Sequence, residues 1–455
     1  MLWQVLAEHL EGFLRSTRTE HSGLPRFVER ELYRFLDCGV LSRGFARVHC
    51  TECGKDELVA FSCKGRGFCP SCGSRRMADL AAHLVDAVLP YAPVRQWVLS
   101  LPYRVRFLLA YDPALCARVR RVLVRAILYW IKARAKHTGA PDGRGGAVCF
   151  VQRFDSALRL NVHFHLLVLD GVFVRGADRR LQFAEIDPPT HADLQALIAR
   201  LSRRLTRIVE AKQDRDPEPS PQAACLAAAV EGRGSRRVAT EPDPEPPLRR
   251  PGKLAAVSDG FSLHAGVRVS QVARDRLEVL CRYVARPPLV ADRLSRTKGG
   301  LVLYRLKKKW SDGSTHVVLE PKVFLQRLCA LVPRPRIPLV TYHGVLAPAA
   351  TWRAEVVPTP PEQVREPHPH AAPPPQSPAR IRKSPRRPWH PWAELMRRVY
   401  RVEVLRCPWC HGQRRLLAFL TNPDVIRKIL DWLRLPLEPP PRVQARDSPD
   451  VVPAW

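Results

Sequence analysis

The chain has 455 residues, and its 74 Lys and Arg residues against 43 Asp and Glu residues give a formal net charge of +31. Hydrophobic residues make up 45% of the chain, which is ordinary for a globular protein and excludes full disorder. A chain this basic is expected to bind a polyanion, and the charge favours nucleic acid as that polyanion. The alternative is a basic surface that serves only solubility.

The first 20 residues predict an amphipathic helix. Charged residues interrupt the segment, so it is not the apolar core of a signal peptide. No apolar run approaches the roughly 18 residues that a membrane span needs. We therefore expect a cytoplasmic protein with no membrane partner. The apolar positions that form one helical face are Leu2, Val5, Leu6, Leu10, Phe13 and Leu14.

A dense cysteine cluster follows this helix. Cys50 and Cys53 form one CxxC pair, Cys69 and Cys72 form another, and the spacing between the pairs is that of a zinc ribbon. Four thiolates complete a closed tetrahedron around Zn²⁺, so the sequence predicts a structural zinc site. Basic residues after the pairs favour a DNA-docking role.

The sequence leaves open the roles of two further cysteines in this region, Cys38 and Cys63. Either could replace one of the four ligands, both could join His49 in a second site, or both could be buried free thiols. The chain has 13 cysteines, and in a reducing compartment such pairs are metal ligands more often than disulfides.

Between residues 94 and 212, runs rich in β-forming residues alternate with helical ones, which predicts an α+β or α/β domain. A stretch rich in Pro and charge, 213–252, is expected to be an insertion that encloses a short helix around AACLAAAV. Ordered chain should resume to residue 356. A Pro/Arg-rich linker (357–388), a small C-terminal CxxC module (389–434) and a Pro-rich tail (435–455) complete the predicted organisation, after an N-terminal domain of residues 1–93.

The run NVHFHLLVLDGVF predicts a buried strand on which His163 and His165 point to the same face. Two imidazoles on one face can chelate a divalent cation, and two unpaired histidines would be costly in a core. If the preceding strand AVCFVQRF forms a hairpin with a turn near Leu158, Gln152 falls roughly opposite His165 and is a candidate third ligand. Asp155 and Asp170 are the alternatives.

The segment SQVARDRLEVLCRYVARPPLV predicts a helix that ends before Pro287, with Tyr283 at the edge of its buried face. A tyrosine in this place is usually a packing residue. In a basic protein with a metal site, however, its hydroxyl is a candidate nucleophile for a covalent DNA link. Tyr304 and Tyr342 are less favoured substitutes.

Near the C-terminus, Cys407 and Cys410 in LRCPWCHG supply only half of a zinc site. A complete site would need His390, His411 or a distant cysteine. The alternative is a bare knuckle in a small strand-turn-strand unit.

These features, in this order, resemble the transposases of the insertion-sequence ninety-one type. The segments FLDCGVLSRGFARVHCTECG, QRFDSALRLNVHFHLLVLDGVF, RYVARPPL and YHGVLAP carry the resemblance, which extends from about residue 25 to residue 355. It implies an α+β fold in which a zinc module precedes an HUH endonuclease domain, an antiparallel sheet flanked by helices, at residues 94–356.

The resemblance also implies a rolling-circle transposase that nicks single-stranded DNA at element ends and rejoins it through a 5′-phosphotyrosine. Tyr283 would be the nucleophile, and His163, His165 and Gln152 would hold Mg²⁺ or Mn²⁺. Positions four residues from Tyr283 are Val279 and Pro287, so the chain resembles the single-tyrosine branch. Self-association could then supply a second nucleophile. A replication initiator or relaxase with the same chemistry, and a zinc DNA-binding protein without catalysis, remain the alternatives.

Overall fold

The structure is a computed structural model that describes residues 1–20, 23–213, 221–231, 235–238, 254–310, 312–358 and 390–441. Most of the predicted 357–388 linker, the later part of the 213–252 insertion and most of the 435–455 tail lie outside these ranges. None of the helices in the described ranges is long and apolar enough to cross a membrane.

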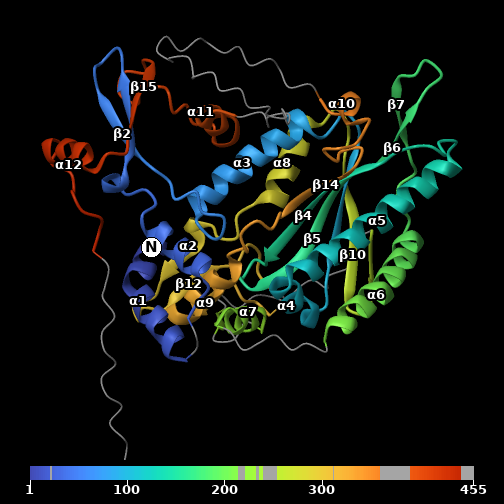
Figure 1. The fold of residues 1–455 in the computed structure, drawn as a ribbon, viewed down its shortest axis with the longest axis horizontal. Helices are drawn as coiled ribbons and strands as arrows, with labels where there is room; N and C mark the ends of the chain where they lie inside the picture. Colours follow the sequence, from blue (N-terminus) through green and yellow to red (C-terminus); the bar gives the residue numbers. More distant parts are fainter. Residues whose placement is uncertain are drawn as a thin grey trace, which may run out of the picture.

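A six-stranded antiparallel sheet forms the centre of the molecule (Figure 1). The adjacent strands β4 and β5 form the expected hairpin, and Leu158 adopts a left-handed conformation in its turn (φ 59°). In spatial order the strands are β14 (Val340–Gly344), β4 (Gly146–Phe154), β5 (Leu160–Leu169), β3 (Val94–Ser100), β10 (Phe261–Val269) and β9 (Ala255–Ser258).

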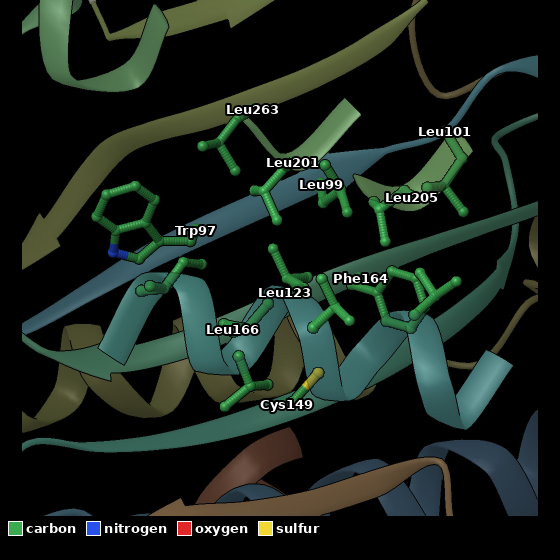
Figure 2. Packing of buried hydrophobic residues seen from close by; sticks show 14 of the residues in the cluster. Trp97, Leu99, Leu101, Leu123, Cys149, Phe164, Leu166, Leu201, Leu205 and Leu263 are labelled. Atoms are coloured by element: carbon green, nitrogen blue, oxygen red, sulfur yellow. The ribbon is translucent and has the colours of Figure 1, made fainter. Parts of the chain in front are cut away.

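Helices cover both faces of this sheet. On one face lie α4 (Tyr103–Tyr111), α5 (Pro113–His137) and α6 (His191–Gln213), and on the other lie α3 (Pro70–Ala87) and α8 (Arg274–Ala285) (Figure 1). The core on the first face packs Trp97, Leu99, Phe164 and Leu166 of the sheet against Leu123 and the leucines of α6 (Figure 2). Leu167 and Leu169 face the second side, against α3 and α8. This alternation places both histidines of β5 on the α8 face.

Smaller units surround the sheet. Helix α1 (Leu2–Glu20) buries all six predicted apolar positions, packs beside α2 (Arg26–Leu36) and contacts α9 (Pro321–Leu331). The short helix expected in the insertion is α7 (Pro221–Glu231), which packs on α9. A four-stranded sheet contains β11 (Leu294–Arg296), β12 (Val302–Arg305), β13 (His316–Leu319) and β8 (Ser235–Val238), and a hairpin contains β6 (Gly171–Arg175) and β7 (Leu181–Glu185). The short helical pieces are η1 (Leu41–Arg43), η2 (Ala291–Arg293) and α10 (Arg353–Val356).

The C-terminal region does not stand alone as a small module. Its strand β15 (Arg414–Leu420) pairs with β1 (Phe45–Cys50), which also pairs with β2 (Asp56–Ala60), so chain ends more than 350 residues apart share one sheet (Figure 1). Helix α12 (Pro423–Trp432) packs Ile426 and Leu430 on Phe45. Ahead of β15, α11 (Trp392–Leu395) and the π-helical turn η3 (Met396–Tyr400) lie against α3. Side-chain packing and strand pairing, which the local sequence does not specify, place this region beside the N-terminal module.

Candidate active site and cysteine clusters

The two histidines of β5 form a pair beneath α8. His163 and His165 are 9% and 3% exposed, and their ring centroids lie 4.9 Å apart. Burial lowers the pKa of His163 to about 4 and that of His165 to about 3. Both imidazoles are therefore neutral near pH 7, and one nitrogen of each ring carries a lone pair.

Hydrogen bonds orient both rings. The Nδ1–H of His163 donates to the Asn161 carbonyl at 2.8 Å, which leaves Nε2 with the lone pair. Nε2 of the buried Gln96 side chain on β3 donates to Nδ1 of His165 at 2.9 Å. In this arrangement the proton of the neutral ring lies on Nε2; exchange of the Gln96 amide oxygen and nitrogen would make Nδ1 the donor and leave the lone pair on Nε2 for a metal. Nε2 of His165 is buried and has no hydrogen-bond partner among the described residues.

Gln152 is the third polar group of the site. It pairs with His163 across the hairpin, whereas we expected it opposite His165, because the pairing of these strands is centred between Ala157 and Leu158 rather than beyond Leu158. Its Nε2 donates to the Val284 carbonyl at 2.9 Å, at the end of α8. Its Oε1 is buried and finds no partner within the described chain.

The alternative third ligands are occupied elsewhere. Asp155 accepts from the Arg159 guanidinium at 2.7 Å and from two backbone N–H groups of its own turn. Asp170 forms a buried ion pair with Arg95 at 2.7 Å and also binds Arg268. Of the three candidates, Gln152 is therefore the one whose oxygen is left available beside the histidines.

Tyr283 reaches the same place from the last turn of α8. Its ring packs edge-on against His165, with centroids 5.8 Å apart, and 40% of the residue is exposed. Tyr304, by contrast, is 1% exposed, and burial raises the pKa of its hydroxyl. Tyr342 lies on β14, which pairs with the far side of β4 from β5. Tyr283 is thus the tyrosine that combines an accessible ring with contact to the histidine pair.

Two cations flank this tyrosine. The Arg286 guanidinium carbon lies 4.4 Å from the Tyr283 ring centroid, and the Lys307 ammonium lies 5.4 Å from it. Nη1 of Arg286 is buried without a hydrogen-bond partner in the described residues. An anion that approaches Tyr283 therefore meets two positive charges close to the ring.

These residues fit a divalent metal. Nε2 of His165 and Oε1 of Gln152 are buried polar atoms without partners among the described residues, and His163 uses Nδ1 for the Asn161 carbonyl, which leaves its Nε2 as the ligand atom. Neutral imidazoles and an amide oxygen suit Mn²⁺ or Mg²⁺ together with phosphate oxygens. The histidine pair by itself was readable from the sequence, whereas Gln96, Arg286 and Lys307 were not identified there. The position of Arg286, one helical turn after Tyr283, is the signal that could have identified it.

Eight of the cysteines form two clusters of four, and neither is the cluster that the sequence predicted. Cys50 and Cys53 do not join Cys69 and Cys72. Cys38 and Cys63 complete the first cluster with Cys69 and Cys72, while Cys407 and Cys410 complete the second with Cys50 and Cys53. The prediction of a single ribbon from the first four ligands is wrong because chain folding, not spacing alone, decides which CxxC pairs meet. His49 instead contacts Asp56 at 2.9 Å.

The first cluster lies where α2, β2 and α3 meet. The Sγ atoms of Cys38 and Cys69 lie 3.8 Å apart and those of Cys63 and Cys72 lie 3.4 Å apart. Neighbouring thiols, led by Cys63, lower the pKa of Cys38 to about 7. All four sulfur atoms lie within 4.8 Å of one another, which is the arrangement of a closed structural zinc site.

Comparison with protein families agrees with this arrangement. Residues 5–101 match the "Transposase zinc-binding domain" of the IS91 type, and residues 146–353 match the family described as "Putative transposase". The chain belongs to the IS91-type transposases. No curated protein and no solved structure matches the chain.

The two family matches contain different candidate sites of the transposase. The first contains the complete cluster of Cys38, Cys63, Cys69 and Cys72, whose thiols are arranged so that they could hold the structural zinc of such a domain. The second contains the histidine pair, Gln152 and Tyr283. The protein is accordingly a DNA-binding, DNA-processing enzyme with an α+β fold, as the sequence predicted. Cys407 and Cys410 lie beyond both matches.

Proposed function

We propose that this transposase nicks and rejoins single-stranded DNA at the ends of a mobile element, with Tyr283 as the nucleophile. The observation that carries the proposal is the contact between the half-exposed Tyr283 ring and the buried His165. A divalent ion bound by His163, His165 and Gln152 would polarise the scissile phosphate and offset the charge that develops on its oxygens.

The chain's own groups support this chemistry. The Tyr283 oxygen forms a bond to phosphorus while the bond from phosphorus to the 3′ oxygen breaks. A water molecule accepts the phenolic proton, and the departing 3′ oxygen takes up a proton from solvent to become a free hydroxyl. Attack by a second 3′ hydroxyl on the 5′-phosphotyrosine reverses these steps and restores the tyrosine. Arg286 and Lys307 are placed to hold the phosphate during both exchanges.

Gln152 links the metal ligands to the nucleophile. Its Nε2 donates to carbonyls at the C-terminal end of α8, at 2.9 Å from Val284 and 3.4 Å from Tyr283. The backbone that carries Tyr283 is therefore tied to the strand that faces the histidines. Catalysis by an in-line displacement depends on this kind of fixed geometry.

Strand exchange in this proposal uses a single tyrosine per chain. The residues four positions before and after Tyr283 are Val279, which is 55% exposed, and Pro287. A second strand transfer must then reuse Tyr283 after it is released, or use Tyr283 of a second subunit.

The experiment that tests this proposal is a covalent-adduct assay. Protein incubated with Mn²⁺ and single strands from both flanks of its gene should give a protein–DNA band that survives denaturation. Tyr283→Phe removes only the hydroxyl, so DNA binding and thermal stability should persist while the band disappears. Tyr304→Phe serves as the matched control and should keep the band if the variant folds. An adduct formed by Tyr283→Phe would contradict the assignment.

A further inference from the structure

The second cysteine cluster lies outside the transposase site and joins the two ends of the chain. We infer that Cys50, Cys53, Cys407 and Cys410 bind a second structural Zn²⁺, which fastens the C-terminal arm, residues 390–441, to the N-terminal module. This inference does not depend on the proposed DNA chemistry. No family match extends to Cys407 and Cys410.

The sulfur positions fit one tetrahedral ion. Sγ of Cys50 lies 3.4 Å from Sγ of Cys410, and Sγ of Cys53 lies 3.7 Å from Sγ of Cys407. A tetrahedron with Zn–S bonds of about 2.3 Å has edges of about 3.8 Å. A disulfide would instead require sulfur atoms about 2 Å apart. All four Sγ atoms lie within 4.8 Å of one another, so zinc can enter with little rearrangement.

The two CxxC turns are built alike. Cys50 N–H donates to the Lys55 carbonyl at 2.9 Å, and Cys407 N–H donates to the Gly412 carbonyl at 2.8 Å. In both turns the donor is the first cysteine and the acceptor lies five residues later. This shared frame aims both thiols of each turn toward the partner turn.

A second hydrogen bond repeats in the same way. Gly54 N–H donates to the Cys50 carbonyl at 3.1 Å, and His411 N–H donates to the Cys407 carbonyl at 3.0 Å. Gly54 and His411 also share a left-handed backbone, with φ of 69° and 60°. A non-glycine residue adopts this conformation at some cost, so the structure around His411 must favour it. Such matched knuckles are the usual frame of a four-cysteine zinc site.

Contacts around the cluster keep the two turns facing each other. The ammonium of Lys55 lies 4.9 Å from the Trp409 ring centroid, and Gln413 N–H donates to the Glu52 carboxylate at 3.4 Å. Beside the turns, Cys50 at the end of β1 pairs with Arg414 at the start of β15. The cluster therefore lies at one end of the sheet formed by β15, β1 and β2.

The arm held in this way also contacts the catalytic domain. Arg398 forms ion pairs with Asp86 of α3 at 2.5 Å and with Glu278 of α8 at 2.8 Å. Helix α8 carries Tyr283, so the arm extends from the zinc cluster to the helix of the nucleophile. A cross-link between such distant parts of a chain restricts the unfolded state strongly, and loss of zinc should release the arm.

The test is zinc analysis of the full-length protein purified under reducing conditions. We expect two zinc ions per chain in the wild type and one in Cys407→Ser/Cys410→Ser. Cys116→Ala/Cys281→Ala removes two thiols outside both clusters and should keep both ions. Retention of both ions by the serine variant, or a Cys50–Cys410 disulfide with one zinc in the wild type, would overturn the inference.

A second measurement separates metal binding from simple packing. Limited proteolysis of the serine variant should cut within residues 390–434 at least about tenfold faster than in the wild type, because cleavage follows the population of the released arm. If the serine variant does not fold, Cys410→His tests the second zinc site instead. Imidazole is a zinc ligand, so this variant should fold, bind two zinc ions and resist the protease. A folded Cys410→His protein with one zinc ion would contradict the second site.

Discussion

At the scale of single residues, the site is defined by buried polar atoms that lack partners. His165 Nε2, Gln152 Oε1 and Arg286 Nη1 are all buried without a hydrogen bond in the described chain. Burial of an unpaired polar group is unfavourable, so three such atoms around one accessible tyrosine indicate a place prepared for a ligand. The proposed metal and phosphate would satisfy them.

The first residue-scale prediction concerns the metal ligands. His163→Ala and His165→Ala should each reduce adduct formation by more than about 100-fold, because even supporting groups around a metal are typically worth about 10–100-fold. Gln152→Ala should have a smaller effect, since water can replace an amide oxygen. The adduct yield of each variant, measured at increasing Mn²⁺ concentrations, checks this order of effects. Normal cleavage by both histidine variants would mean that the pair is structural.

Arg286 provides the second residue-scale prediction. Removal of one group that stabilises developing charge typically costs about 10²–10³ in rate, so Arg286→Ala should slow adduct formation by that order. Arg286→Lys keeps the charge and should be less impaired. Single-turnover rates at saturating DNA provide the measurement. Equal rates for Arg286→Ala and the wild type would remove Arg286 from the phosphate site.

At the scale of elements, the approach of α3 to the end of α8 connects the zinc module to the catalytic helix. Gly73 follows Cys72 of the first cysteine cluster, and a Cβ at this position would lie 2.6 Å from Cβ of Pro287, just beyond α8. Only a residue without a side chain permits this contact. The position of Tyr283 therefore depends on a glycine in a different module.

This contact gives a prediction at the element scale. Gly73→Ala should lower the stability by about 1 kcal/mol, because an overpacking cost of about 1–3 kcal/mol exceeds the roughly 1 kcal/mol that alanine gains in a helix. Gly12→Ala in α1 meets nothing within 4 Å and should instead stabilise the protein. Urea unfolding of both variants tests the contrast. A stabilised Gly73→Ala protein would show that α3 can move away from Pro287 without cost.

At the scale of the whole molecule, the formal charge of +31 dominates association with DNA. Counterion release should make the logarithm of the binding constant for single strands fall linearly with the logarithm of salt concentration, by about 0.7 for each phosphate neutralised. Fluorescence anisotropy with a labelled strand at several salt concentrations provides the slope. A flat dependence would mean that the basic surplus serves only solubility.

The sequence by itself determined the parts of this protein that follow local periodicity. Strand alternation placed His163 and His165 on one face, and helical spacing predicted the buried face of α1 and the position of Tyr283 beside a buried stripe. These patterns are local because side-chain direction follows the backbone repeat. The α+β fold and the transposase family were readable for the same reason, since their motifs are continuous in the chain.

Only the tertiary structure decided which distant groups meet. The spacing of Cys50, Cys53, Cys69 and Cys72 suits a single zinc ribbon, yet strand pairing between β1 and β15 brings Cys407 and Cys410 to the first pair. The register of the hairpin likewise placed Gln152 opposite His163 instead of His165. A CxxC turn specifies two ligands but not their partners, because long-range pairing energy, rather than local sequence, selects the other half of the tetrahedron.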